Sequence, residues 1–242
     1  MKRQIKSNAP SFKDIPFSIL VKEVKELSDL HNEYAKKSKK QRERAAEYQY
    51  NDSYSSTLFN RLIGEESRDF RWTGEMVALA IDPDYAPAIL TVGSQEYLYG
   101  RKDEAMTHFL KLTTLPKNTE DLTEIIDKAG DFLIQNKDFD NAIVLYASAV
   151  RNYPGNPVYH NGLSYCYAKI GDYIKAVEEA RITVSLDLEN HIYLTDLGWT
   201  LVEAHMYDEA QSVLEHAVKV APPEYDLAMN NLEELQRRRK RK

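Results

Sequence analysis

The chain has 242 residues, of which 43% are hydrophobic and 29% are charged, with one cysteine and a formal net charge of −6. This apolar content suffices for one or two folded domains, which excludes a wholly disordered chain. A single cysteine excludes an intramolecular disulfide framework and a cysteine-rich zinc module. No stretch approaches 18 uninterrupted apolar residues and the basic N-terminus lacks a signal-peptide core, so we expect a soluble, cytoplasmic protein without a membrane span.

The charge is unevenly distributed along the chain. Residues 1–50 carry a net charge of +5, residues 51–236 carry −17, and residues 237–242 carry +6. The chain is therefore an acidic body between two basic ends. Such asymmetry bears on the choice of partner and not on the fold.

Residues 1–50 are interpreted as a basic N-terminal extension, with 1–14 disordered and 15–50 helical. Apolar residues recur there at helical spacing, at Phe17, Leu20, Val24, Leu27 and Tyr34. The helix either folds back on the rest of the chain or forms a coiled coil with a second copy. We favour the first interpretation, because only about two heptads support a coiled coil and three to four are expected.

A repeated pattern follows the N-terminal segment. Four alanines stand 37, 34 and 34 residues apart, and a glycine or serine lies twelve residues before each one. Three of the four copies have an aromatic residue three positions before the alanine, and three close with a proline. Small residues let two helices approach closely, and proline ends the second helix. The alanines with their small partners are Ala105 with Gly93, Ala142 with Gly130, Ala176 with Ser164, and Ala210 with Gly198.

This pattern resembles the tetratricopeptide repeat family, whose unit is a helix–turn–helix of 34 residues. The resemblance covers four units, at 86–119, 123–156, 157–190 and 191–223, and it implies an all-α, right-handed superhelical solenoid. A degenerate first repeat is expected at 51–85, where residues 78–83 look like the closing end of a unit. Residues 224–242 are expected to cap the last repeat with a helix over 224–236, followed by the basic tail.

No catalytic, cofactor or metal site is expected, and hence no enzyme activity. The sequence has no glycine-rich phosphate loop and neither the H-E-x-x-H nor the G-x-S-x-G motif. Cys166 is interpreted as a small buried hydrophobe. The histidines lie apart, without the spacing of metal ligands, at His31, His108, His160, His191, His205 and His216.

Function is therefore expected at the surface. In the resembled family the first helix of each repeat lines a concave groove that holds a peptide or a helix. For Tyr165 and Trp199 the alternative is simple packing between helices. The groove candidates carried onto this chain are Leu90, Ser94, Tyr97, Asp127, Lys128, Asp131, Asn161, Tyr165, Lys169, Thr195, Asp196, Trp199 and Glu203.

The acidic members of this set favour a basic or amphipathic partner segment. Chaperone-binding members of the family hold a C-terminal carboxylate with Lys, Asn and Arg side chains from three successive repeats. Two registers correspond to these positions, and neither supplies the cations, so a carboxylate clamp is disfavoured. The registers are Leu90, Ser94, Lys128, Val158 and Gly162, and then Asp127, Asp131, Gly162, Ile192 and Asp196.

The leading interpretation is thus a non-catalytic scaffold or adaptor that binds another protein in its groove. An alternative from another class is a nucleic-acid-associated regulatory or assembly factor that uses its basic segments. The acidic body would repel a polyanion, which disfavours nucleic acid. A third possibility is self-association, with a basic end docked in the groove of another copy. The tail could also be a targeting address or a solvated helix end. The basic segments are residues 36–44 and the tail Arg237, Arg238, Arg239, Lys240, Arg241 and Lys242.

Overall fold

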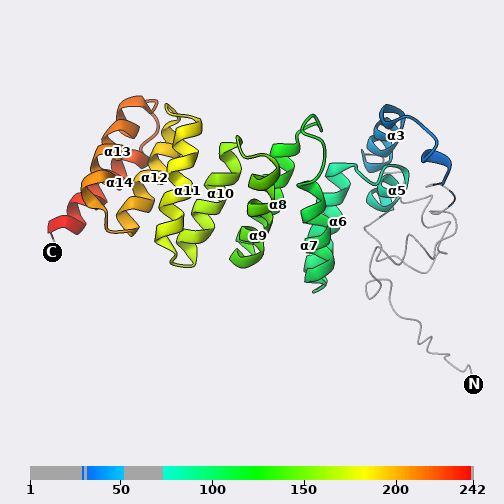
Figure 1. The fold of residues 1–242 in the computed structure, drawn as a ribbon, viewed down its shortest axis with the longest axis horizontal. Coiled ribbons are helices and arrows are strands. Elements are labelled where there is room, and N and C mark those ends of the chain that lie inside the picture. Colours follow the sequence, from blue (N-terminus) through cyan, green and yellow to red (C-terminus); the bar gives the residue numbers. More distant parts are fainter. Residues whose placement is uncertain (1–28, 30–31, 52–72, 241–242) are drawn as a thin grey trace, which may run out of the picture. The chain divides into compact units, whose positions relative to one another are not determined.

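The computed structural model describes residues 29, 32–51 and 73–240 (Figure 1). In these ranges every regular element is an α-helix. Residues 15–28, 30 and 31 of the predicted N-terminal helix and most of the degenerate first repeat lie outside the described residues. The chain divides into two compact units, 1–125 and 126–242.

The helices occur in consecutive pairs that match the repeat pattern. In the C-terminal unit, α10 packs against α11 and α12 against α13, while α9 packs against α10 and α11 against α12. The N-terminal unit pairs α3 with α5 and α6 with α7. Its helices are α3 (Lys39–Asn51), α5 (Thr73–Ile81), α6 (Ala86–Leu98) and α7 (Lys102–Leu112), and α8 (Leu122–Gln135) spans the boundary between the units. Those of the C-terminal unit are α9 (Phe139–Asn152), α10 (Pro157–Lys169), α11 (Tyr173–Leu186), α12 (His191–Glu203), α13 (Tyr207–Val220) and α14 (Leu227–Lys240).

The small residues of the pattern lie where the two helices of a repeat meet. A Cβ atom added to Gly198 would lie 2.5 Å from Cδ2 of Leu214, the residue four positions after the repeat alanine. The same contact recurs between Gly93 and Phe109 and between Gly130 and Tyr146. We call these contacts the seams. Because the facing side chains already fill the available space, a larger residue at the glycine would displace them.

The third repeat forms its seam with different residues. Ser164 takes the place of the glycine, and Ala180 takes the place of the large facing residue. Both are buried, and the Ser164 hydroxyl donates a hydrogen bond to the Ala176 carbonyl at 2.9 Å. The larger first residue is thus accompanied by a smaller second one, which conserves the volume of the seam.

The turns between the two helices of each repeat share one backbone conformation. A residue with positive φ stands five positions before each repeat alanine, and the N–H of the next residue donates to the carbonyl five positions before it, which closes the helix end in the manner of a Schellman motif. Glycine adopts this conformation without steric cost, whereas a residue with a side chain does so at a cost of about 1 kcal/mol. The four residues are Gly100 (φ 81°), Lys137 (φ 58°), Gly171 (φ 84°) and His205 (φ 60°).

A buried histidine joins two successive repeats. Nδ1 of His160 lies 2.7 Å from Oε2 of Glu179 on α11, and Nε2 lies 3.0 Å from the carbonyl oxygen of Pro154, in the turn before α10. The His160 side chain is almost entirely enclosed. Both ring nitrogens have an acceptor, so His160 contributes to packing and hydrogen bonding within the array.

The last helix, α14, covers the fourth repeat and is longer than predicted. It packs on α12 and α13, with Leu235 and Ala228 fully buried. The helix continues to Lys240, four residues beyond the predicted end at residue 236. Arg237 and Arg238 pair with Glu233 and Glu234 one turn earlier, which favours continuation, and cations suit a helix C-terminus.

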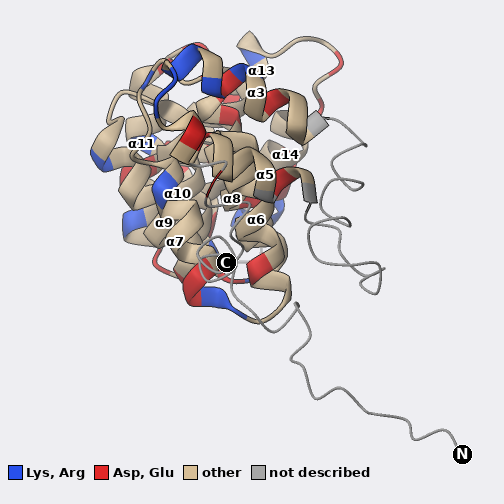
Figure 2. Ribbon diagram, turned by 90° about the vertical axis from the view of Figure 1, so that its right-hand side faces the viewer, with Lys and Arg blue, Asp and Glu red and all other residues tan. Residues whose placement is uncertain are grey.

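The predicted all-α repeat architecture is confirmed for the described residues. Acidic residues are spread over the helices of both units (Figure 2). None of the described helices is both long enough and apolar enough to cross a membrane.

Candidate functional site

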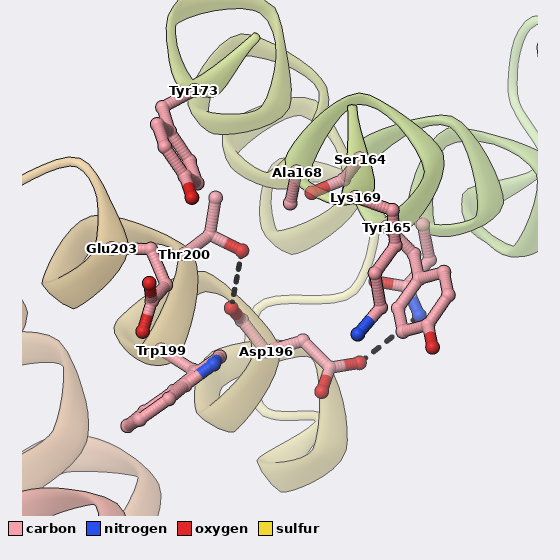
Figure 3. Close-up of a pocket in the computed structure, with 10 residues that line it drawn as sticks. Ser164, Tyr165, Ala168, Lys169, Tyr173, Asp196, Trp199, Thr200 and Glu203 are labelled. Atoms are coloured by element: carbon pink, nitrogen blue, oxygen red, sulfur yellow. Dashed lines mark hydrogen bonds between the residues drawn. The ribbon is translucent and has the colours of Figure 1, made fainter. Parts of the chain in front are cut away.

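Two adjoining pockets lie along the first helices of three repeats in the C-terminal unit. The larger, of about 510 Å³, lies between α10 and α12 (Figure 3), and the second, of about 360 Å³, is lined mainly by α8 and α10. Asn161 and Tyr165 line both pockets, so the two pockets are continuous, and together we call them the groove. Its other lining residues are Asp127, Asp131, Ile134, Tyr146, Val158, Gly162, Ser164, Ala168, Lys169, Tyr173, Tyr193, Asp196, Trp199, Thr200 and Glu203.

Helical periodicity places these side chains on one face of each helix. On α12 the groove residues Asp196, Trp199 and Glu203 follow one another at intervals of three and four. The opposite face of the same helix carries Leu197 and Leu201, which are buried in the core with Leu214 and Leu235. One face of α12 is therefore fixed by packing while the other stays open to a ligand.

Most groove candidates of the C-terminal unit line the groove. Lys128 is exposed and lines neither pocket. Thr195, contrary to expectation, lies outside the groove: it is fully buried, and its hydroxyl donates to the His191 carbonyl at 2.6 Å. This bond satisfies the hydroxyl within α12, which makes its burial inexpensive. The candidates that line the groove are Asp127, Asp131, Asn161, Tyr165, Lys169, Asp196, Trp199 and Glu203.

The three candidates of the first complete repeat belong to the N-terminal unit. Leu90 and Ser94 are half-buried, and the Ser94 hydroxyl donates to the Leu90 carbonyl at 2.9 Å. Tyr97 is buried, with the ammonium group of Lys102 4.8 Å from the centre of its ring. These contacts give all three residues a role in the packing of their own unit.

The carboxylates of the groove are partly enclosed by protein. The Tyr146 hydroxyl donates to Oδ1 of Asp127 at 2.8 Å, and Nδ2 of Asn161 donates to Oδ2 of Asp196 at 3.0 Å. Burial raises the pKa of Asp127, Asp131 and Asp196, and for Asp127 and Asp196 it outweighs the opposing effect of these hydrogen bonds. The ionised forms of these carboxyl groups are therefore destabilised by burial, and an incoming cation would stabilise them.

Two aromatic side chains stand at the rim of the larger pocket. Tyr165 is 46% exposed, and Nζ of Lys169 lies 4.8 Å from the centre of its ring. Trp199 is half-buried and packs against the core cluster of the fourth repeat, so it takes part in both packing and the groove. The guanidinium carbon of Arg238, on α14, lies 5.0 Å from the Trp199 ring centre. Both rings are thus contacted by cations of the chain itself.

Comparison with known proteins supports the repeat assignment. No family model matches the chain. Over 105 residues it is 28% identical to the small glutamine-rich tetratricopeptide repeat-containing protein 2 of Mycosarcoma maydis. That match covers 43% of this chain and 30% of the relative, so the chain matches less than a third of the relative's length. It agrees with the period, the seams and the paired helices. The chain is thus similar to a tetratricopeptide repeat protein over the residues of this match.

Solved structures with similar folds include tetratricopeptide proteins. The Sgt2 tetratricopeptide domain of Aspergillus fumigatus is 22% identical with a TM-score of 0.47, over 52% of this chain and 85% of that one. YrrB, described as a tetratricopeptide protein with an unusual peptide-binding site, is 17% identical with a TM-score of 0.48, over 88% of this chain and 96% of that one.

The three described arginines of the basic tail interact with acidic and amide groups of the chain itself. Nη1 of Arg238 lies 3.0 Å from Oε1 of Glu203, a groove residue. Arg239 pairs with Asp208 and donates to Gln211, and Arg237 pairs with Glu233 and Glu234. Lys240 is exposed, and Arg241 and Lys242 lie outside the described residues. The three arginines therefore contribute ion pairs to the array.

Several lining residues were not predicted from the sequence. Tyr193 precedes Asp196 by three residues and so shares its helix face, a signal that helical spacing contains. Tyr173 is the first residue of α11, and sequence reasoning assigned the groove to first helices alone. Figure 3 shows its hydroxyl directed towards Thr200. The second helix of a repeat thus also contributes to the groove.

Catalytic and metal-binding groups were not expected from the sequence. Within 29, 32–51 and 73–240, no group of three or more His, Cys, Asp or Glu side chains could hold a metal ion. Cys166 is fully buried, and burial raises the pKa of its thiol to about 12. A thiol in this environment stays protonated and unreactive at neutral pH.

Proposed function

We propose that this tetratricopeptide array is a non-catalytic interaction scaffold that holds a peptide or helix of another protein in the groove. Tetratricopeptide domains generally serve protein–protein interaction. The observation that carries the proposal is the groove itself, which continues across α8, α10 and α12 and has the exposed Tyr165 ring at its centre. A tyrosine ring offers a large contact area at a low entropy cost, which suits it to anchor a partner.

The charge of the groove supports a partner segment other than a C-terminal tail. A carboxylate clamp requires cations, whereas the groove contains four carboxylates, at Asp127, Asp131, Asp196 and Glu203, and one ammonium group, at Lys169. An incoming carboxylate would be repelled at close range. The proposed partner therefore presents an internal segment, basic or amphipathic in character.

Capture of partners by matched variants tests the proposal. The full-length chain is compared with Tyr165→Ala, which removes the rim ring, and with Ile174→Ala as the control. Ile174 is 77% exposed and lies outside both pockets. Proteins retained from native lysate are identified, and the binding segment of one of them is synthesised and titrated against each variant. We expect Tyr165→Ala to weaken binding about tenfold, as a central aromatic anchor does, and Ile174→Ala to change nothing. Equal binding by the native chain and both variants would refute the proposal that the partner binds in the groove.

Nucleic acid remains the alternative of a different class, and the described structure does not favour it. Arg237, Arg238 and Arg239 are paired with acidic or amide groups of their own chain, so less positive charge is left for phosphates. A gel mobility shift with RNA and DNA, with and without residues 237–242, distinguishes the two classes. The interaction scaffold predicts no shift at physiological salt with either form.

A further inference from the structure

The larger pocket of the groove combines carboxylates with aromatic rings in a way that suits a cation. Asp196 and Glu203 stand two turns apart on one face of α12, with the Trp199 indole between them. Tyr165 faces them from α10 across the pocket (Figure 3). A volume of about 510 Å³ falls in the range of ligand sites.

The chain itself shows which group these side chains hold. The guanidinium of Arg238 lies against the Trp199 ring and pairs with Glu203 at 3.0 Å, so ring and carboxylate already act together on an arginine. Lys169 contacts Tyr165 in the same manner. An aromatic face with a nearby carboxylate attracts a cation through the ring quadrupole and through charge.

Asp196, the other carboxylate of this pocket, forms no ion pair with any described residue. The Asp196 side chain accepts a hydrogen bond from a neutral amide, that of Asn161. Burial disfavours the ionised form of Asp196 and raises its pKa. A cation that enters the pocket would stabilise this carboxylate, whereas a neutral or anionic group would not.

From these contacts we infer that the larger pocket is a subsite for an arginine side chain of the bound partner, held by Asp196, Glu203 and the rings of Tyr165 and Trp199. The inference rests on the proposed function, because it assigns one side chain of the segment that occupies the groove. Arg238 then shares Glu203 and Trp199 with the ligand and competes with it from the edge of the pocket.

The test uses arginine and its neutral isostere on the intact chain. Nα-acetyl-arginine methylamide and Nα-acetyl-citrulline methylamide are titrated at low salt, and amide and indole signals are followed by ¹H–¹⁵N NMR. A Trp72→Phe background leaves Trp199 as the sole tryptophan. We expect saturable shifts of the Trp199 indole and of α10 and α12 amides with the arginine probe, and binding weaker by about three- to tenfold with citrulline. Equal affinity for both probes, or shifts confined to other helices, would overturn the inference.

Two variants with opposite expected effects separate a subsite from a structural change. Asp196→Asn keeps the shape of the side chain and should weaken the arginine probe about three- to tenfold while leaving the citrulline probe unchanged. Arg238→Gln removes the internal competitor and should strengthen the arginine probe about two- to fivefold. Leu235 keeps α14 in place in this variant, and thermal unfolding checks that it does.

These outcomes are distinct from those of the proposed function. If a partner segment depends on Tyr165 yet arginine and citrulline bind alike, the scaffold stands and the subsite is wrong. If Arg238→Gln binds the arginine probe no more tightly than the native chain, the shared use of Glu203 is wrong.

Discussion

The seams between helices and the groove are built on opposite principles, although the same helices form both. In the seams, a glycine meets a large side chain so closely that an added Cβ on Gly198 would stand 2.5 Å from Leu214. In the groove, carboxylates such as Asp196 are partly buried without an opposite charge, and burial raises the pKa of that carboxyl. The seams are optimised for packing, while the groove retains charges that packing alone would not select. This difference identifies the groove as the part adapted to a ligand.

The largest expected effect comes from breaking a seam. Gly198→Ser should lower the free energy of unfolding by about 2 kcal/mol, because the new side chain overlaps Leu214. The third repeat accommodates serine opposite Ala180, so Leu214→Ala should partly compensate Gly198→Ser. Urea unfolding of the two single variants and the double variant gives the coupling free energy, expected at about 1 kcal/mol in the favourable direction. If the losses in free energy of unfolding are additive, the side chains at positions 198 and 214 do not compete for the same space in the seam.

The polar contact of His160 provides the second largest effect. His160→Ala leaves the Pro154 carbonyl and the Glu179 carboxylate without their buried partner, and it should cost about 1.5 kcal/mol of stability. His216→Ala is the control, since its ring is exposed and lies 3.7 Å from the exposed Glu189. That variant should stay within about 0.5 kcal/mol of the native chain. Equal losses in both variants would remove the distinction between buried and exposed polar contacts.

The turns between helices offer a smaller effect of opposite sign. Lys137 has φ 58° in a turn where two equivalent positions are Gly100 and Gly171. Lys137→Gly should therefore raise the free energy of unfolding by about 0.5 kcal/mol, because the relief of steric cost exceeds the added entropy of the unfolded chain. Gly171→Ala should lower it by about 1 kcal/mol. Thermal unfolding that orders the two variants the other way would contradict this account of the turns.

The affinity for the arginine probe should depend on pH in a direction that the groove carboxylates determine. Burial raises the pKa of Asp196, so this group takes up a proton at higher pH than a solvated aspartate does. Protonation removes the charge that binds the guanidinium. The affinity should therefore fall as the pH drops through this raised pKa, and Asp196→Asn should reduce the dependence. If the native chain keeps the same affinity over the acidic range, the ionisation of Asp196 does not contribute to binding of the arginine probe.

Sequence reasoning reached the seams and much of the groove because both follow from helical spacing. The positions of Gly198 and Leu214 follow from the repeat, and their close contact from the need to pack two helices. The position of Thr195 did not follow, since it is adjacent to Asp196 in sequence and only the packing around α12 decides which of them is buried. The approach of Arg238 to Trp199 depends on how α14 docks, a long-range contact that no local pattern encodes.

The stability and the affinity of Asp196→Asn, measured side by side, test the central claim most directly. A folded-state pKa raised above that of the unfolded chain means that the ionised Asp196 lowers stability at neutral pH, and that this loss disappears as pH falls through the raised pKa. Asp172→Asn is the control, because the pKa of that carboxyl is lowered by its hydrogen bonds with Lys175, and its loss should lower stability. At neutral pH we predict that Asp196→Asn unfolds at higher urea concentration than the native chain and binds the arginine probe more weakly. A variant that is less stable, or that binds as tightly as the native chain, would contradict the account of the groove as a binding site retained against stability.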